Sequence, residues 1–138
     1  RRFGEKIEEA CGAEVLRRIL GGAEISKAEH AGRYYHRALK AKKLIELEFE
    51  KAFKKYDCII SPTVPRLPHK MGEKISVEEM YSYDVLTTPA NLAGICGVSI
   101  PCDKIKGVPV GMQILGPKFT DEKMLDIAKV FEKLLIRL

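Results

Sequence analysis

The sequence predicts an α/β fold in which helices cover a mixed β-sheet. Two runs rich in aliphatic residues, 98–102 and 108–115, flank a turn-like segment and indicate a hairpin. Amphipathic helices are indicated both before and after these runs. The 138 residues are 46% hydrophobic and 31% charged, which is enough to build a core. No stretch has the length and composition of a linker, so residues 1–138 are expected to form a single unit.

Short helices are expected at the start of the chain. Apolar residues spaced by three and four indicate a first helix that Gly12 interrupts. The same spacing resumes in a second helix that contains Arg18. This second helix is expected to end at the Gly21–Gly22 pair, because glycine favours helix termination.

A long helix is predicted to follow. Ser26 and Glu29 have the spacing of a capping box, in which each side chain binds a backbone N–H of the other residue. The apolar positions after this cap recur at helical spacing and predict one buried stripe. These positions are Tyr34, Ala38, Ala41, Ile45, Phe49, Ala52, Phe53 and Tyr56.

The remaining elements are strands and one terminal helix. Residues 58–60 form an apolar run without alternation, which indicates a strand covered on both faces. The hairpin turn is expected within Asp103–Gly107, where the glycine supplies a positive-φ position. The last helix is predicted to begin after Thr120. Its apolar stripe consists of Met124, Ala128, Phe131, Leu135 and Leu138.

Charge, cysteine spacing and the length of the apolar runs give no indication of nucleic-acid binding, metal binding or a membrane span. The formal charge is +5, but the basic residues alternate with glutamates, so no nucleic-acid patch is indicated. The four cysteines lack metal-ligand spacing and are expected to be reduced packing residues. The apolar runs are far too short to cross a bilayer, and no signal peptide is recognisable.

The sequence shows no catalytic machinery of its own. Its serines are isolated rather than placed in a glycine-rich loop, and its histidines lack metal-ligand spacing, so no catalytic residue and no metal ligand are predicted. Residues Tyr83–Gly94, which include Asp84, mix small and polar residues, and Arg18 follows a second arginine in an apolar helix. Such mixtures often line clefts. The residues alone leave a structural alternative open: Arg18 as a surface cation near a helix end and Asp84 as a helix N-cap.

Several segments resemble the carboxyl-terminal portion of the amidase-signature family. Four blocks occur in the family's order, at 56–65, 91–94, 98–101 and 109–116. Within the family, Glu14–Gly21 and Tyr83–Pro89 most resemble the A subunits of glutamyl-tRNA(Gln) amidotransferases. The chain departs from the family at Cys96, where proline is usual, and its segment 26–33 is about two residues longer than usual.

The resemblance implies a glutaminase function completed by other chain segments and partners. It implies a Ser-cis-Ser-Lys triad upstream of Arg1, so that this chain is expected to be a fragment. The upstream serine would attack the glutamine amide and release ammonia. A partner, the B subunit, would use ATP and magnesium to activate glutamate on misacylated tRNA, and ammonia would convert it to glutaminyl-tRNA. A small C subunit would bridge the complex, which is expected to be cytoplasmic, and no cofactor is expected in this chain.

The resemblance also assigns two substrate-binding residues. Arg18 would hold the α-carboxylate of glutamine, and Asp84 would hold its α-ammonium. Opposite charges suit the two ends of a zwitterion, and a planar guanidinium suits a carboxylate. Both residues are expected to face one cleft, with an apolar patch exposed near 58–60. Two alternatives stay open: another amidase-signature hydrolase, and an interaction module without catalytic function.

Overall fold

The computed structural model describes residues 10–25 and 28–135 of the chain. Contacts gather into two compact units, Arg1–Ala41 and Lys42–Leu138. Their boundary falls inside helix α3 (Ala28–Phe53), so a continuous helix joins them rather than a loop. This explains why composition showed no linker there. That residues 1–138 belong to a single domain stays a prediction.

The first unit contains helix α2 (Ala13–Ile25), none of whose residues is buried. The predicted end at Gly21–Gly22 is wrong, because α2 continues through both glycines to Ile25. A glycine inside a helix costs about 1 kcal/mol relative to alanine but does not forbid the conformation. The predicted first helix falls mostly outside the described residues, as does the Ser26 end of the predicted capping box.

Helix α3 confirms the predicted long helix, but its apolar stripe is only partly covered. Ile45, Phe49 and Phe53 are half-buried, and the two phenylalanine rings stack with centroids 6.1 Å apart. Four other positions of the predicted stripe are exposed: Tyr34, Ala38, Ala41 and Tyr56. The prediction of one continuous buried stripe is therefore wrong at these positions, because helical periodicity marks an apolar face without showing what covers it.

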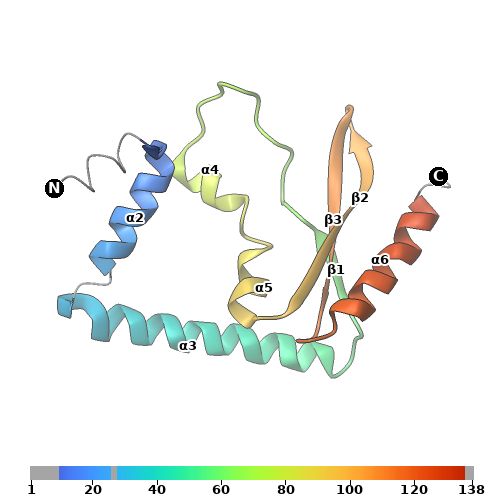
Figure 1. The fold of residues 1–138 in the computed structure, drawn as a ribbon, viewed down its shortest axis with the longest axis horizontal. Helices are drawn as coiled ribbons and strands as arrows, with labels where there is room; N and C mark the ends of the chain where they lie inside the picture. The colour runs from blue at the N-terminus through green and yellow to red at the C-terminus, as the bar shows by residue number, and fades with distance from the viewer. Residues whose placement is uncertain (1–9, 26–27, 136–138) are drawn as a thin grey trace. The chain divides into compact units, whose positions relative to one another are not determined.

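The second unit is built around a three-stranded sheet of order β1-β3-β2 (Figure 1). Its strands are β1 (Ile59–Pro62), β2 (Cys96–Ile105) and β3 (Val108–Gly116). The predicted hairpin is confirmed as β2–β3, and its tight turn has positive φ at Lys106 (52°) and Gly107 (81°). The α/β class is confirmed, and the described strands pair only antiparallel rather than in the predicted mixed sheet.

Strand β1 differs from its prediction because it lies at an edge of the described sheet. Ile60 pairs with Ile114 yet remains 45% exposed, so β1 is not covered on both faces. A short apolar run does not distinguish a central strand from an edge strand. The predicted apolar patch is present here, since Ile59 and the exposed Leu44 of α3 line one shallow groove.

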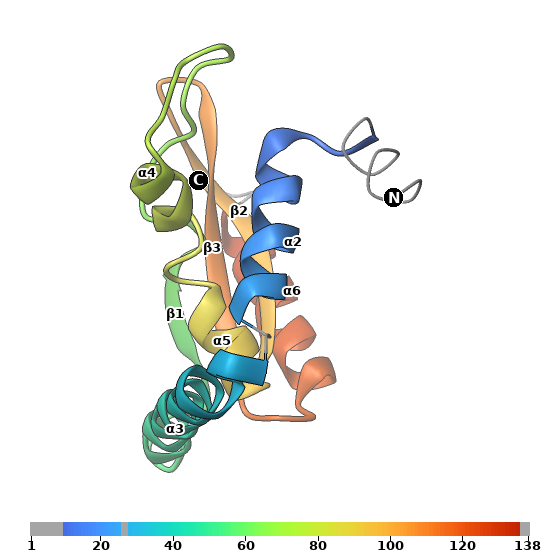
Figure 2. The ribbon, with the colours of Figure 1, turned by 90° about the vertical axis from the view of Figure 1, so that its left-hand side faces the viewer.

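The core lies between the sheet and helix α6 (Asp121–Leu135), whose predicted stripe is confirmed as far as Leu135; Leu138 is outside the described residues. Ile114 and Met124 are its most deeply buried large side chains. The opposite side of the sheet carries helices α4 (Val77–Ser82) and α5 (Thr88–Ala93) (Figures 1 and 2). Consequently β3 has an apolar face toward α6 and a second face toward α5, where the polar side chains lie.

Cys58 and Cys96 pack in the core, as predicted. All four cysteines are free thiols. Buried Cys96 accepts a hydrogen bond from the Thr120 N–H at 3.3 Å, and its thiol lies 3.3 Å from Asp121 Oδ2. The thiol therefore links the start of β2 to the start of α6.

Candidate functional site

A cavity of about 310 Å³ lies on the α5 side of the sheet. All three strands or their extensions contribute to its lining, together with α5. Its polar lining residues are Thr63, Thr87, Asn91, Ser99 and Gln113. The cavity therefore presents hydroxyl and amide groups rather than charged ones.

A row of polar side chains crosses the sheet beneath this cavity. Ser61 and Ser99 are both register partners of Gln113, so their side chains lie on one face. Gln113 is 5% exposed, and its Nε2 donates to Ser61 Oγ at 2.9 Å and to the Leu86 carbonyl at 3.0 Å. This buried amide thus joins β3 both to β1 and to the segment that precedes α5.

Gly111 allows two hydroxyl groups to meet above β3. Thr63 donates its backbone N–H to the Gly111 carbonyl at 3.0 Å, and its hydroxyl lies 2.6 Å from that of Ser99. A Cβ on residue 111 would lie 2.8 Å from the Thr63 hydroxyl oxygen. A side chain at 111 would therefore displace this hydroxyl pair, which explains glycine there.

The serines of the second unit make structural hydrogen bonds, as predicted. Ser61 accepts from Gln113, Ser76 caps α4, Ser82 donates to the Glu79 carbonyl at 2.7 Å, and Ser99 pairs with Thr63. In the part of the chain that the structure describes, no cluster of three or more His, Cys, Asp or Glu side chains could hold a metal ion. The same part contains no helix long and apolar enough to span a bilayer.

Asp84 lies in the turn between α4 and α5. Its carbonyl accepts hydrogen bonds from Thr88 N at 2.8 Å, Thr87 N at 3.2 Å and Thr87 Oγ1 at 3.3 Å. Thr87, rather than Asp84, is the N-cap residue of α5. These hydrogen bonds hold the Asp84 backbone one helical turn before Thr87, which lines the cavity.

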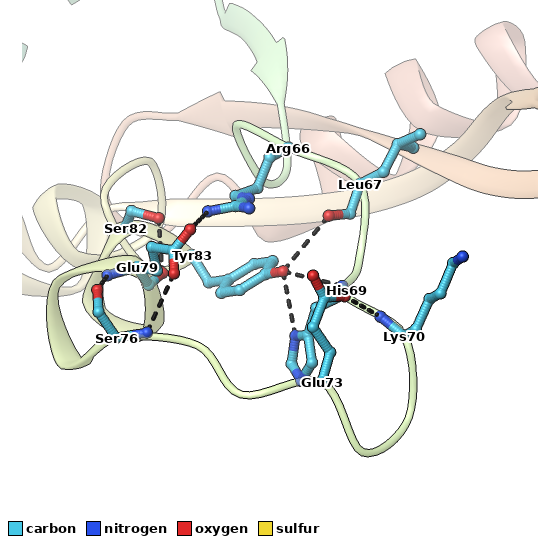
Figure 3. A network of polar contacts seen from close by, with 9 residues as sticks. All are labelled: Arg66, Leu67, His69, Lys70, Glu73, Ser76, Glu79, Ser82 and Tyr83. Atoms are coloured by element: carbon cyan, nitrogen blue, oxygen red, sulfur yellow. Dashed lines mark hydrogen bonds and ion pairs between the residues drawn. The ribbon is translucent and has the colours of Figure 1, made fainter.

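Tyr83 is held by the segment that connects β1 with α4 (Figure 3). Its hydroxyl accepts from the His69 N–H at 3.1 Å, lies 3.2 Å from His69 Nδ1, and donates weakly to the Leu67 carbonyl at 3.4 Å. The Arg66 guanidinium lies 5.6 Å from the centre of the Tyr83 ring and pairs with Glu79 at 3.2 Å. These contacts fix the residue immediately before Asp84.

A capping box starts the helix that leads to this turn. Ser76 Oγ accepts from the Glu79 N–H at 3.1 Å, and Glu79 Oε2 accepts from the Ser76 N–H at 3.0 Å (Figure 3). The Ser76 N–H, together with Arg66, lowers the pKa of the Glu79 carboxyl. The capping box was not predicted from the sequence, although its serine and glutamate have the required spacing.

Arg18 lies on α2, in the first unit. Its Nε donates to Glu14 Oε1 at 2.7 Å, and Arg17 binds the same carboxylate at 2.7 Å. Both hydrogen bonds lower the pKa of the Glu14 carboxyl, and the bond from Arg18 has the larger effect. The Arg18 side chain remains 52% exposed.

The predicted substrate-binding residues thus lie in different units, Arg18 on α2 and Asp84 in the α4–α5 turn, and both are exposed. A cleft shared by the two stays a prediction. Sequence reasoning missed Tyr83 and Gln113 as residues that hold the Asp84 segment. A signal for Gln113 did exist, because it is a lone amide within an apolar strand whose hairpin register was predictable.

Comparison with known proteins gives consistent matches. The family model described as Amidase matches residues 1–125. Over 133 residues, which are 96% of this chain, the sequence is 56% identical to a protein named as the A subunit of glutamyl-tRNA(Gln) amidotransferase from Methanocaldococcus jannaschii. The protein of the same name from Methanobrevibacter smithii is 47% identical over 132 residues. The chain spans 31% and 29% of the lengths of these relatives.

Two solved structures share the fold. A crystal structure of the glutamyl-tRNA(Gln) amidotransferase A subunit from Thermotoga maritima matches with a TM-score of 0.67 and 34% identity, over 87% of this chain and 27% of that one. A crystal structure described as an amidase matches with a TM-score of 0.78 and 25% identity, over 95% of this chain and 30% of that one.

Proposed function

The chain belongs to the amidase family, and from that membership we propose that it forms part of the glutamine-hydrolysing subunit of a tRNA-dependent amidotransferase. The observation that carries this proposal is the 56% identity, over 96% of the chain, to a relative named as such a subunit. The matched crystal structure of a subunit with the same name supports it.

The proposed reaction converts glutamine and water into glutamate and ammonia. A serine elsewhere in the complete subunit loses its proton to a base, and its oxygen bonds to the carboxamide carbon of glutamine. The C–N bond then breaks, and the nitrogen leaves as ammonia after taking up a proton. Water cleaves the resulting ester, which restores the serine and yields glutamate. In this proposal the described residues bind the substrate and do not break its bonds.

Arg18 and Asp84 are proposed to form a glutamine clamp. The guanidinium of Arg18 would bind the α-carboxylate, and the carboxylate of Asp84 would bind the α-ammonium. The structure offers physical support for each residue separately. Glu14 holds Arg18 through a 2.7 Å hydrogen bond while leaving it 52% exposed, and three hydrogen bonds to its carbonyl hold the Asp84 backbone.

The partners of this subunit are part of the same proposal. The B subunit would activate tRNA-bound glutamate with ATP and magnesium, and the C subunit would bridge the complex. Ammonia released by the present subunit would then convert glutamyl-tRNA(Gln) into glutaminyl-tRNA(Gln). We place this complex in the cytoplasm.

The test compares two nitrogen donors in a complete amidase subunit that carries these residues, assembled with its partner subunits. Arg18→Ala and Asp84→Asn should each weaken glutamine use by roughly ten- to two-hundredfold, because a charge-assisted contact contributes about 1.5 to 3 kcal/mol. Free ammonia bypasses the glutamine pocket, so ammonia-dependent transamidation should change less than about twofold.

Two neighbouring substitutions serve as matched controls. Arg17→Ala removes a second arginine bound to Glu14, and Asp103→Asn removes an exposed carboxylate elsewhere in the second unit. Neither should alter glutamine use by more than about threefold. Equal losses with glutamine and with ammonia in the Arg18 and Asp84 variants would contradict the clamp. Hydrolysis of simple amides at rates similar to glutamine would instead favour another amidase-signature hydrolase.

A further inference from the structure

We propose that Gln113 is a positioning residue for substrate binding, because its buried amide fixes the turn that carries Asp84. This inference rests on the proposed function, since it gives Gln113 a role only if Asp84 binds the ammonium of glutamine. Gln113 itself would not touch the substrate. It acts through the carbonyl of Leu86, two residues after Asp84.

The hydrogen bonds of Gln113 link three parts of the second unit. Its side chain lies on the central strand β3 and is 5% exposed. Its amide nitrogen donates to Ser61 on β1 and to the Leu86 carbonyl, at 2.9 and 3.0 Å. An amide NH₂ has two hydrogens, so these two acceptors use its full donor capacity. A buried polar group with both donors satisfied holds its neighbours in one arrangement.

The turn itself transmits this position to Asp84. Thr87 and Thr88 both donate backbone N–H groups to the Asp84 carbonyl, so residues 84–88 form one hydrogen-bonded turn. Leu86 lies inside this turn, and its carbonyl is held from β3 by Gln113. Displacement of Leu86 would therefore displace Asp84.

The turn is held from its other end as well. Tyr83, which directly precedes Asp84, is bound through its hydroxyl to His69 and Leu67 (Figure 3). Asp84 thus lies between a residue fixed to the β1–α4 segment and a carbonyl fixed to the sheet. Binding groups that must meet a small substrate need such support, because errors of about 0.5 Å already weaken recognition.

Glutamine is the side chain that this role requires. Gln113 donates to the Leu86 carbonyl, which neither methionine nor ionised glutamate can do. Gln113→Met keeps the length of the side chain but removes both donors. Gln113→Glu keeps its shape and, when ionised, replaces the donors with acceptors. The two variants therefore break the same contact to Leu86 by different physical means.

The experiment uses the complete amidase subunit with its partner subunits and measures KM and kcat for glutamine, together with the ammonia-dependent rate. Gln113→Met and Gln113→Glu should each raise the KM for glutamine about three- to tenfold. The ammonia-dependent rate should stay within about twofold of the unmodified enzyme. Ser61→Ala is the matched control, because it removes the other partner of the same amide and leaves Leu86 bound. It should change the KM by less than about twofold.

A double-mutant cycle separates this inference from the function on which it rests. In the Asp84→Asn background, Gln113→Met should raise the KM by less than about twofold further, because it acts through Asp84. If Asp84→Asn alone leaves the KM unchanged, the proposed function fails. If Asp84→Asn raises the KM but the Gln113 variants do not, or their effects multiply, the positioning role is overturned. Equal loss with both nitrogen donors in both Gln113 variants would also overturn it, because general damage to the fold would explain that result.

Discussion

Replacing Gly116 with alanine would test how closely α6 packs on the sheet. Gly116 ends β3 and pairs with Cys96, and Met124 of α6 lies directly over it. A Cβ at position 116 would lie 2.7 Å from both Cγ and Cε of Met124, and closer still to its sulfur. Because Met124 is only 1% exposed, its side chain can make room for a new methyl group only by repacking within the core.

The expected magnitudes follow from this contact. Inserting a methyl group into a filled core costs about 1 to 3 kcal/mol, and we expect Gly116→Ala to fall in this range. Met124→Ala removes the buried side chain and should cost about 2 to 5 kcal/mol. In the double variant the new methyl occupies part of the space that Met124 has left. Its cost should therefore be smaller than the sum of the two single costs, by about 1 kcal/mol or more.

Urea-induced unfolding followed by circular dichroism would give the free energy of unfolding of each variant. Gly22→Ala is a matched control, because it makes the same substitution in α2 where no atom lies within 4 Å of the added carbon. It should leave stability unchanged or raise it by about 0.5 to 1 kcal/mol. A loss below about 0.5 kcal/mol for Gly116→Ala, or additive costs in the double variant, would refute the packing argument.

Two further predictions concern catalysis and pH. The purified 138-residue chain should release no ammonia from glutamine, because the proposed function assigns the nucleophile to another part of the complete subunit. Glutamine turnover that co-elutes with this chain would contradict this prediction. Hydrogen bonds from Lys118 at 2.5 Å and from Lys43 at 2.8 Å lower the pKa of the Glu46 carboxyl from 4.5 to about 2. The bond from Lys118 has the larger effect. Since the folded state has the lower pKa, these ion pairs stabilise the fold above about pH 4.5 and lose their effect as the pH falls toward about 2. Glu46→Gln should flatten the decline of the unfolding temperature over this interval, and an unchanged decline would argue against the ion pairs.

Local patterns predicted the elements whose neighbours are close in sequence. The β2–β3 hairpin needs only a two-residue turn between two aliphatic runs, and the glycine at 107 supplies one positive φ. Helix α6 was predictable because the spacing of Met124, Ala128 and Phe131 marks the face that packs on this hairpin. In both cases the residues that contact one another are separated by no more than about 40 positions in the sequence.

Long-range packing decided the features that sequence reasoning missed. Whether Ile60 lies in a central or an edge strand depends on what pairs with β1, and its apolar character is compatible with either. The position of Gln113 beneath the Asp84 turn depends on a contact with Leu86, 27 residues earlier. Arg18 and Asp84 were selected from family resemblance, since their charges alone fit ordinary surface roles equally well.

Strand β2 contains a bulge between Pro101 and Asp103 that bears on the solubility of the protein. As an outer strand of the described sheet, β2 is ten residues long, and a straight edge of that length is a template for pairing with another polypeptide. The register shifts between Pro101 and Asp103, and the proline has no N–H to donate. Beyond this point Asp103 and Lys104 place charges on the edge. Another polypeptide could therefore pair without interruption along only about half of β2, which limits edge-to-edge aggregation of the sheet.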